Sequence, residues 1–104
     1  MVRLIGVKTT REMLNRAMEF LQAKLKNQKV FIKFDNSKYD NENNLFCYLY
    51  LQNKTFVNAH LIKTGFVDVN DNFDYKYKPK FLNLIQQTVK NARNSYKLLY
   101  LFFI

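Results

Sequence analysis

The first residues of the chain carry a strand pattern that passes directly into a helix start. Val2 to Val7 is rich in apolar and β-branched residues, which predicts a strand. Thr9-x-x-Glu12 is a capping-box pattern, in which the Thr hydroxyl and the Glu carboxylate satisfy free N–H groups at a helix end. The predicted helix that follows has an apolar stripe at helical spacing, formed by Met13, Ala17, Phe20, Leu21 and Leu25.

The middle of the chain predicts strands separated by polar loops. An alternating pattern over Val30 to Phe34 indicates a half-buried strand. A polar loop, Asp35 to Asn44, leads to a second strand at Leu45–Leu51, and a turn leads to a short strand at Thr55–Val57. These segments provide the strands of a small sheet.

Helix signals return in the second half of the chain. Asn58 is the expected N-cap of a short helix through Lys63, and Gly65 is its expected left-handed C-cap. Pro79 marks the start of a last helix, because proline is favoured in the first turn. The apolar stripe of that helix is Phe81, Leu84, Ile85, Val89 and Ala92. The order of strands and helices predicts a single α+β domain.

Composition narrows the class of partner. The chain has 104 residues, of which 48% are hydrophobic, so it can bury a core. Its formal charge of +9 favours a polyanionic partner, because clustered Lys and Arg attract phosphates. Cys47 is the single cysteine, which excludes a disulfide within the chain and a cysteine-based zinc site.

No signal peptide is evident in the sequence, so we expect the chain as given to be cytoplasmic. The apolar run Leu98 to Ile104 is too short to span a bilayer, and we expect no membrane association. This run is either a packed final strand or an exposed apolar end.

Two groups of residues resemble the staphylococcal nuclease-like (thermonuclease) family. The phrase VRLIGVKTTRE, Val2 to Glu12, is similar to the family wording R-L-x-G-x-D-T-P-E. Further matches follow in family order and at near-family spacing: Ala17, Phe20, Leu21, Leu25, Lys29, Val30, Phe34, Asp35, Asp40, Phe46, Tyr48, Tyr50, Leu51, Val57, Asn58, Leu61, Ile62, Gly65 and Ala92-Arg93.

The resemblance implies a five-stranded OB-type β-barrel with three helices. Val2 corresponds to a position after the second strand of that fold, so we expect a barrel that lacks its first two strands. We expect a partial nuclease-like domain over residues 1–95 and an apolar C-terminal tail over residues 96–104.

The resemblance also implies a calcium site, and this chain departs from it. Arg3 matches one of the family's two phosphate-stabilising arginines, and Thr9 matches a threonine whose carbonyl helps to bind calcium. Lys8 stands where the family has a calcium-binding aspartate, and a positive charge there would repel the ion. Arg11 replaces the glutamate that orients water, and Asn44 replaces the second arginine. For Arg3 itself, an ordinary strand-edge cation is the favoured interpretation and a phosphate-binding residue is the alternative.

Five residues match positions that surround the nucleotide in the family. They are Lys38, Tyr39, Tyr75, Tyr77 and Lys78. Tyrosines can stack on bases while lysines follow the phosphates. Solvated loop residues are an equally good interpretation of the same set.

We therefore expect a catalytically inactive nuclease-like domain that retains at most weak nucleic-acid binding and needs no cofactor. One alternative is an active, calcium-dependent nuclease that uses displaced acidic residues: Glu12, Asp35 and Asp40. Another is an interaction module that accepts a partner strand, or a second copy of itself, at an open barrel edge.

Overall fold

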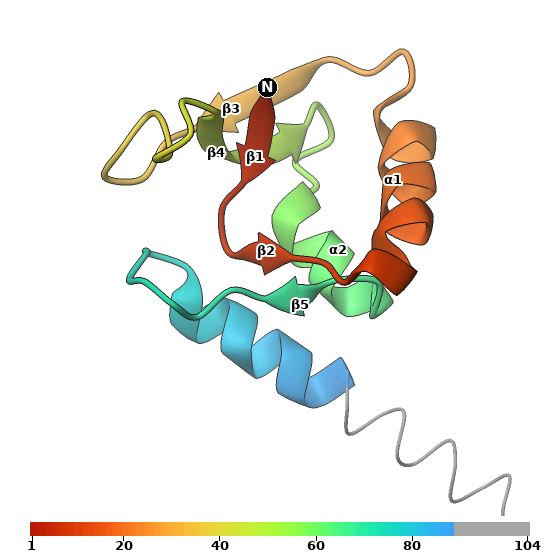
Figure 1. The fold of residues 1–104 in the computed structure, drawn as a ribbon. Helices are drawn as coiled ribbons and strands as arrows, with labels where there is room; N and C mark the ends of the chain where they lie inside the picture. Colours follow the sequence, from red (N-terminus) through yellow and green to blue (C-terminus); the bar gives the residue numbers. More distant parts are fainter. Residues whose placement is uncertain (89–104) are drawn as a thin grey trace, which may run out of the picture.

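The computed structural model describes residues 1–88 and shows a mixed α+β domain (Figure 1). The strands are β1 (Val2–Leu4), β2 (Val7–Lys8), β3 (Val30–Lys33), β4 (Leu45–Leu51) and β5 (Asp68–Val69). The helices are α1 (Arg11–Leu25), α2 (Val57–Thr64) and a third helix that begins at residue 78 and continues to residue 88. Val89, Ala92 and the predicted tail over residues 96–104 lie outside the described residues.

The strands form two small open sheets and no closed barrel within residues 1–88. One sheet has the order β1-β4-β3, with β1 parallel and β3 antiparallel to β4. The other sheet pairs β2 with β5. The expectation of a barrel is thus corrected for the described residues, because a three-stranded sheet with short outer strands does not close on itself.

The single strand predicted over Val2 to Val7 is wrong, because the chain bends at Gly6. Gly6 has φ of 79°, in the left-handed region that glycine adopts most readily. The bend divides the segment between the two sheets. Ile5 N–H donates to the Cys47 carbonyl at 2.9 Å, while the Gly6 carbonyl accepts from Asn70 N–H at 2.8 Å.

Helix α1 begins one residue later than the capping box predicts. Its N-cap is Thr10, whose hydroxyl accepts a hydrogen bond from Met13 N–H at 3.3 Å. Thr9 is outside the helix, so the predicted Thr9–Glu12 capping box is wrong. The apolar stripe is confirmed, since Ala17 is buried and the other stripe residues from Phe20 to Leu25 pack against the core.

Helix α2 also has a different start. The predicted strand at Thr55–Val57 is replaced by an isolated bridge between Tyr50 and Phe56, and the helix starts at Val57. Its N-cap is Phe56, so the prediction of Asn58 as N-cap is wrong. The left-handed C-cap at Gly65 is confirmed, with φ of 79°.

Asn58 is instead fully buried and joins three segments of backbone. Its Oδ1 accepts from Leu49 N–H at 2.9 Å, and its Nδ2 donates to the carbonyls of Ile5 and Cys47 at 3.0 and 3.3 Å. An amide side chain can both accept and donate hydrogen bonds, so this one residue bonds to backbone groups of β4 and of the segment after β1. The buried asparagine fixes α2 against the larger sheet.

The core lies between the larger sheet, α2 and the third helix. Its fully buried side chains include Ile5, Tyr48, Leu61, Ile62 and Phe81. Cys47 is buried in β4 as expected, and burial raises the pKa of its thiol. No helix within residues 1–88 is long and apolar enough to cross a membrane.

Strand β3 departs from its predicted half-buried pattern. Val30, Ile32 and Phe34 are all exposed, as is Phe31 on the other face. The alternation was a sound signal for a strand, but β3 is the last strand of its sheet and no described element packs over it. The prediction of a half-buried strand is therefore wrong about burial.

Candidate nucleic-acid interface

Arg3 lies against an acidic residue from the loop before β4. Its Nη1 donates a hydrogen bond to Asp40 Oδ2 at 3.4 Å, and its guanidinium carbon is 6.0 Å from the centre of the Phe46 ring. The Arg3 side chain is 49% exposed, whereas that of Asp40 is 8% exposed. Both residues line a cavity of about 450 Å³, the Arg3 cavity.

Asp40 organises its loop as well as pairing with Arg3. Asn44 donates to its carboxylate from the backbone N–H at 2.8 Å and from Nδ2 at 3.1 Å, and Glu42 N–H donates at 3.0 Å. Desolvation tends to raise the pKa of Asp40, but these hydrogen bonds and Arg3 outweigh it and hold the pKa below its ordinary value. A phosphate that reached Arg3 would have to compete with this ionised carboxylate.

Three other residues of the N-terminal phrase, Lys8, Thr9 and Arg11, are exposed. Lys8 is on β2, opposite Asp68 of β5 in the ladder. The Thr9 hydroxyl donates to the Thr10 carbonyl at 3.2 Å, and Arg11 is the first residue of α1. The structure brings Arg3 and Asn44 together through Asp40, and no ion pair or hydrogen bond joins Lys8 or Arg11 to that group among residues 1–88.

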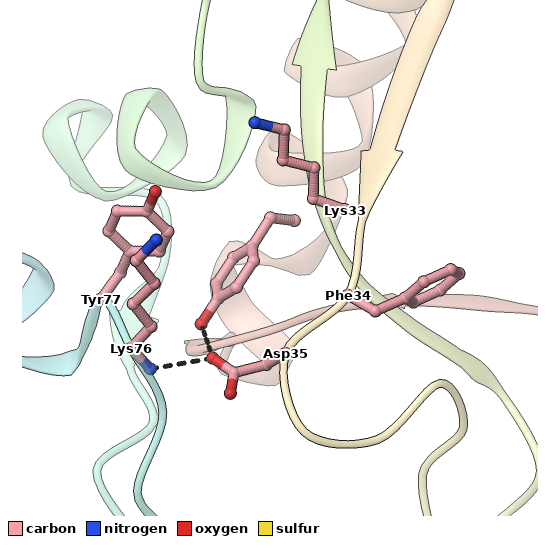
Figure 2. A pocket seen from close by; sticks show the side chains of 6 residues that line it. Lys33, Phe34, Asp35, Lys76 and Tyr77 are labelled. Carbon is pink, nitrogen blue, oxygen red and sulfur yellow. Dashed lines mark hydrogen bonds between the residues drawn. The ribbon is translucent and has the colours of Figure 1, made fainter.

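A second cavity, of about 290 Å³, lies between β3 and the start of the third helix (Figure 2). We call it the Tyr77 pocket, and it is lined by Lys33, Phe34, Asp35, Tyr48, Lys76 and Tyr77.

Asp35 closes the floor of the Tyr77 pocket. Its Oδ2 accepts hydrogen bonds from the Tyr48 hydroxyl and from Lys76 N–H, the latter at 2.8 Å (Figure 2). Desolvation tends to raise the pKa of Asp35, but these bonds and that from Asn36 N–H lower it below the ordinary value. Burial raises the pKa of Tyr48, and its hydrogen bond to the charged Asp35 carboxylate raises it further. The Asp35 carboxylate is therefore held by hydrogen bonds within the protein.

Two lysines lie beside the ring of Tyr77. The Nζ atoms of Lys76 and Lys80 lie 5.3 and 5.9 Å from the centre of its ring. A hydrogen bond from Tyr50 lowers the pKa of Tyr77, and the positive charges of Lys76, Lys33 and Lys80 act in the same direction. The positive charges of these three lysines would also favour a phosphate.

The five residues predicted by resemblance to contact nucleic acid do not form one surface. Tyr77 lines the pocket that bears its name, and Tyr39 lines the Arg3 cavity. Tyr75 is buried in the core, where its hydroxyl donates to the Asn70 carbonyl at 2.9 Å. Lys78 pairs with Asp74 at 3.4 Å. Lys38 lies between two rings, with Nζ 5.6 Å from Phe34 and 5.8 Å from Tyr39.

Three lysines of this region were missed by sequence reasoning: Lys33, Lys76 and Lys80. A signal for two of them was present. Lys76 lies between the two matched tyrosines, and Lys80 follows Tyr77 by three residues, the spacing that places side chains on one helix face. Lys33 has no such signal, because its approach to the pocket depends on the antiparallel pairing of β3 with β4.

Comparison with known proteins identifies the family of this chain. The model of the family described as staphylococcal nuclease homologue matches residues 1–99. The chain belongs to this family. No curated protein matched the sequence significantly.

The calcium chemistry that the resemblance to staphylococcal nuclease implies can be tested against the donor atoms of this chain. Residues 1–88 contain no group of three or more His, Cys, Asp or Glu side chains placed to hold a metal ion. The carboxylates of Asp35 and Asp40 are engaged with protein donors, and Lys8 presents an ammonium group. Calcium prefers six to eight oxygen ligands, so this donor set does not fit the ion. The displaced set of Glu12, Asp35 and Asp40 is not gathered into one cluster either.

The hydrogen bonds to the Asp35 carboxylate predict that the stability of the protein depends on pH. The Asp35→Asn substitution is expected to lower the free energy of unfolding by about 1–2 kcal/mol at neutral pH, because a charged acceptor of three hydrogen bonds is lost. The pKa of Asp35 in the folded protein lies below its ordinary value of 3.8. The ionised carboxylate therefore stabilises the folded state fully above pH 3.8, and this stabilisation is lost as the pH falls through the folded pKa. Urea unfolding of both proteins between pH 2 and pH 7 measures this.

The control for this prediction is Asp74→Asn, which removes an exposed surface pair with Lys78. Such pairs contribute about 0–1 kcal/mol, so this variant should differ little from the parent protein at any pH. A difference between Asp35→Asn and the parent that stayed constant down to pH 2 would contradict the role of the charge.

Proposed function

We propose that this member of the staphylococcal nuclease family binds single-stranded nucleic acid at the Tyr77 pocket and does not cleave it. The observation that carries the proposal is the position of Lys76 and Lys80 beside the ring of Tyr77, with Lys33 lining the same pocket. Single-stranded nucleic acids bind where a basic groove follows the phosphates and aromatic rings receive the bases.

The local charge supports a phosphate ligand at this pocket. Asp35 is the one acidic residue that lines it, and its carboxylate accepts bonds from Tyr48 and Lys76 N–H. The lysine side chains are exposed, so their ammonium groups can turn toward a ligand. The overall charge of +9 adds long-range attraction for a polyanion.

Neighbouring aromatic side chains hold the ring of Tyr77 in position. Tyr77 meets Tyr48 edge-on at 4.9 Å between ring centres and Phe56 at 5.0 Å. These contacts hold the ring in place, while Tyr77 keeps part of its surface accessible. In Figure 2 the ring of Phe34 points away from Tyr77, so Phe34 offers a second, separate ring at the pocket's edge. Two separated rings next to lysines suit successive bases of an unpaired strand.

The proposed absence of cleavage rests on the residues that replace the family's calcium ligands and second arginine. Lys8 and Arg11 are cations at the matched positions, and Asn44 is bound to Asp40. Arg3 is paired with the same carboxylate. We further propose that the open sheet β1-β4-β3 corresponds to part of the family's OB-type barrel.

The binding proposal predicts a charge-specific loss of affinity. Lys76→Glu and Lys33→Glu are each expected to weaken binding of a fluorescent single-stranded oligonucleotide by about three- to tenfold at low salt, and to reduce its salt dependence. The matched control is Lys63→Glu, an equal charge change in the last turn of α2. Fluorescence anisotropy titrations measure the affinities. Equal losses in Lys63→Glu would show general attraction to a basic protein and would contradict a site at Tyr77.

The same oligonucleotides test the absence of cleavage. Incubation of DNA and RNA with the protein and calcium is expected to leave the substrates intact on denaturing gels. Cleavage that a chelator abolishes, and that Asp40→Asn or Glu12→Gln also abolishes, would instead support the displaced-carboxylate nuclease.

A further inference from the structure

Strand β3 has a sheet neighbour on one side only among residues 1–88. Its register with β4 places Ile32 opposite Leu49 and Val30 opposite Leu51. Leu49 N–H donates to Asn58 Oδ1, and Leu51 N–H donates to the Thr55 carbonyl, so neither bonds to β3.

These two hydrogen bonds fix which backbone groups of β3 face outward. In an antiparallel ladder, hydrogen-bonded and non-hydrogen-bonded pairs alternate. The pairs made by Ile32 and Val30 are the non-hydrogen-bonded ones, so the N–H and C=O groups of Val30 and Ile32 point away from β4. They form a ready template for another strand.

The side chains of β3 are unusually apolar for an exposed edge. Val30 is 41% exposed, Phe31 54% and Ile32 39%, and Phe34 beyond the strand is 43% exposed. Val30 and Ile32 lie on one face of the sheet and Phe31 on the other, so the apolar surface continues around the edge. Large exposed apolar patches are a mark of interaction sites, and these four side chains are neighbours in the sequence.

The charges around β3 indicate what kind of strand it accepts. Lys29 precedes the apolar run and Lys33 ends it, and both are exposed. A second copy would bring another chain of charge +9 to the same edge, which electrostatic repulsion opposes. A strand with carboxylates at its two ends would instead pair with both lysines.

We propose that the outer edge of β3 accepts an extended segment of an acidic protein partner, added as a further antiparallel strand. The partner presents apolar side chains opposite Val30, Phe31 and Ile32 and carboxylates opposite Lys29 and Lys33. Backbone hydrogen bonds to Val30 and Ile32 supply the pairing, and the alternating side chains and end charges supply the specificity. This interaction is independent of the Tyr77 pocket apart from Lys33, which lines both.

The experiment uses the full chain and a capped peptide of sequence SEVYVES, with SKVYVKS as its charge-reversed control. Titration followed by amide NMR is expected to shift the Val30 and Ile32 resonances in a saturable way. The lysine peptide is expected to bind at least about tenfold more weakly. Ile32→Lys is expected to abolish binding, whereas Leu14→Lys, at an equally exposed apolar position on α1, should retain it.

Three outcomes would overturn the proposal. A dimer by light scattering that Ile32→Lys converts to monomer would identify a second copy as the occupant. Slow amide exchange at Val30 and Ile32 in the free monomer would show that these groups already have hydrogen-bond partners within the chain. The absence of saturable peptide binding would also exclude an acidic strand.

The two proposals can fail separately. Lys76→Glu should weaken oligonucleotide binding and leave peptide binding unchanged, and Ile32→Lys should do the reverse. If the parent protein binds only the oligonucleotide or only the peptide, the proposal for the other ligand is wrong.

Discussion

Replacing Gly6 with alanine is expected to lower the free energy of unfolding by about 2–5 kcal/mol. Gly6 has φ of 79°, where a side chain strains the backbone. A Cβ atom there would also lie 2.6 Å from Phe81 Cδ2 and 2.8 Å from Tyr75 Cε2, both on buried rings. Neither ring can withdraw without disturbing the core, so strain and overpacking add. Urea unfolding followed by circular dichroism measures the loss.

Gly65→Ala is the matched control because Gly65 has the same φ of 79°. Among residues 1–88, the nearest atom that a Cβ at this position would meet is Thr88 Cγ2 at 3.9 Å, which is ordinary contact. This variant should therefore show the backbone cost alone, about 1 kcal/mol. Equal losses in the two variants would mean that the close approach of Phe81 and Tyr75 to Gly6 is not energetically important.

Replacing Asn58 with alanine is expected to cost about 3–5 kcal/mol, since three buried backbone groups lose a partner at once. The Leu49 N–H and the Ile5 carbonyl would be left without a bond, and the Cys47 carbonyl would keep only Ile5 N–H. An unsatisfied buried polar group costs about 1–3 kcal/mol. Thermal and urea unfolding give the stability, and amide exchange at Leu49 should quicken most.

Two variants separate the hydrogen bonds of Asn58 from its packing. Asn58→Asp keeps the acceptor for Leu49 N–H but turns a carboxylate toward two carbonyls, which raises the pKa of the new group. Its stability should therefore improve relative to the parent as pH falls and the group gains a proton to donate. Asn53→Ala removes comparable bonds to Thr55 in an exposed turn and should cost under about 1 kcal/mol. A similar cost for Asn53→Ala and Asn58→Ala would contradict the role of burial.

The elements that local pattern controls were predictable from sequence. Strand β4 has the predicted bounds, Leu45–Leu51, and the α1 stripe faces the core as its spacing requires. The bend at Gly6 was not predictable, because the apolar pattern continues across it and the reason for the glycine is a contact with Phe81, far away in sequence. Asn58 was misjudged for a related reason: asparagine favours N-caps, but here tertiary hydrogen bonds place it inside the helix.

The residues of the candidate site were predictable where they match positions of the family pattern. Tyr77 was identified by resemblance, and the replacements at Lys8 and Arg11 are visible in the sequence. The contact of Arg3 with Asp40 depends on the path of a loop that has no regular pattern, so no spacing rule could have revealed it. The same holds for Tyr75, whose burial depends on the packing of the third helix against the bend at Gly6.

The pairing of β2 with β5 limits which side chains position 8 can accept. Lys8 lies directly opposite Asp68 in this ladder, and like charges directly opposite each other destabilise a strand pair. A carboxylate at position 8 would therefore face the Asp68 carboxylate across the ladder and weaken the pairing of the two strands. A neutral side chain at position 68 would relieve that repulsion, so the residues at these two positions are coupled in their effect on stability.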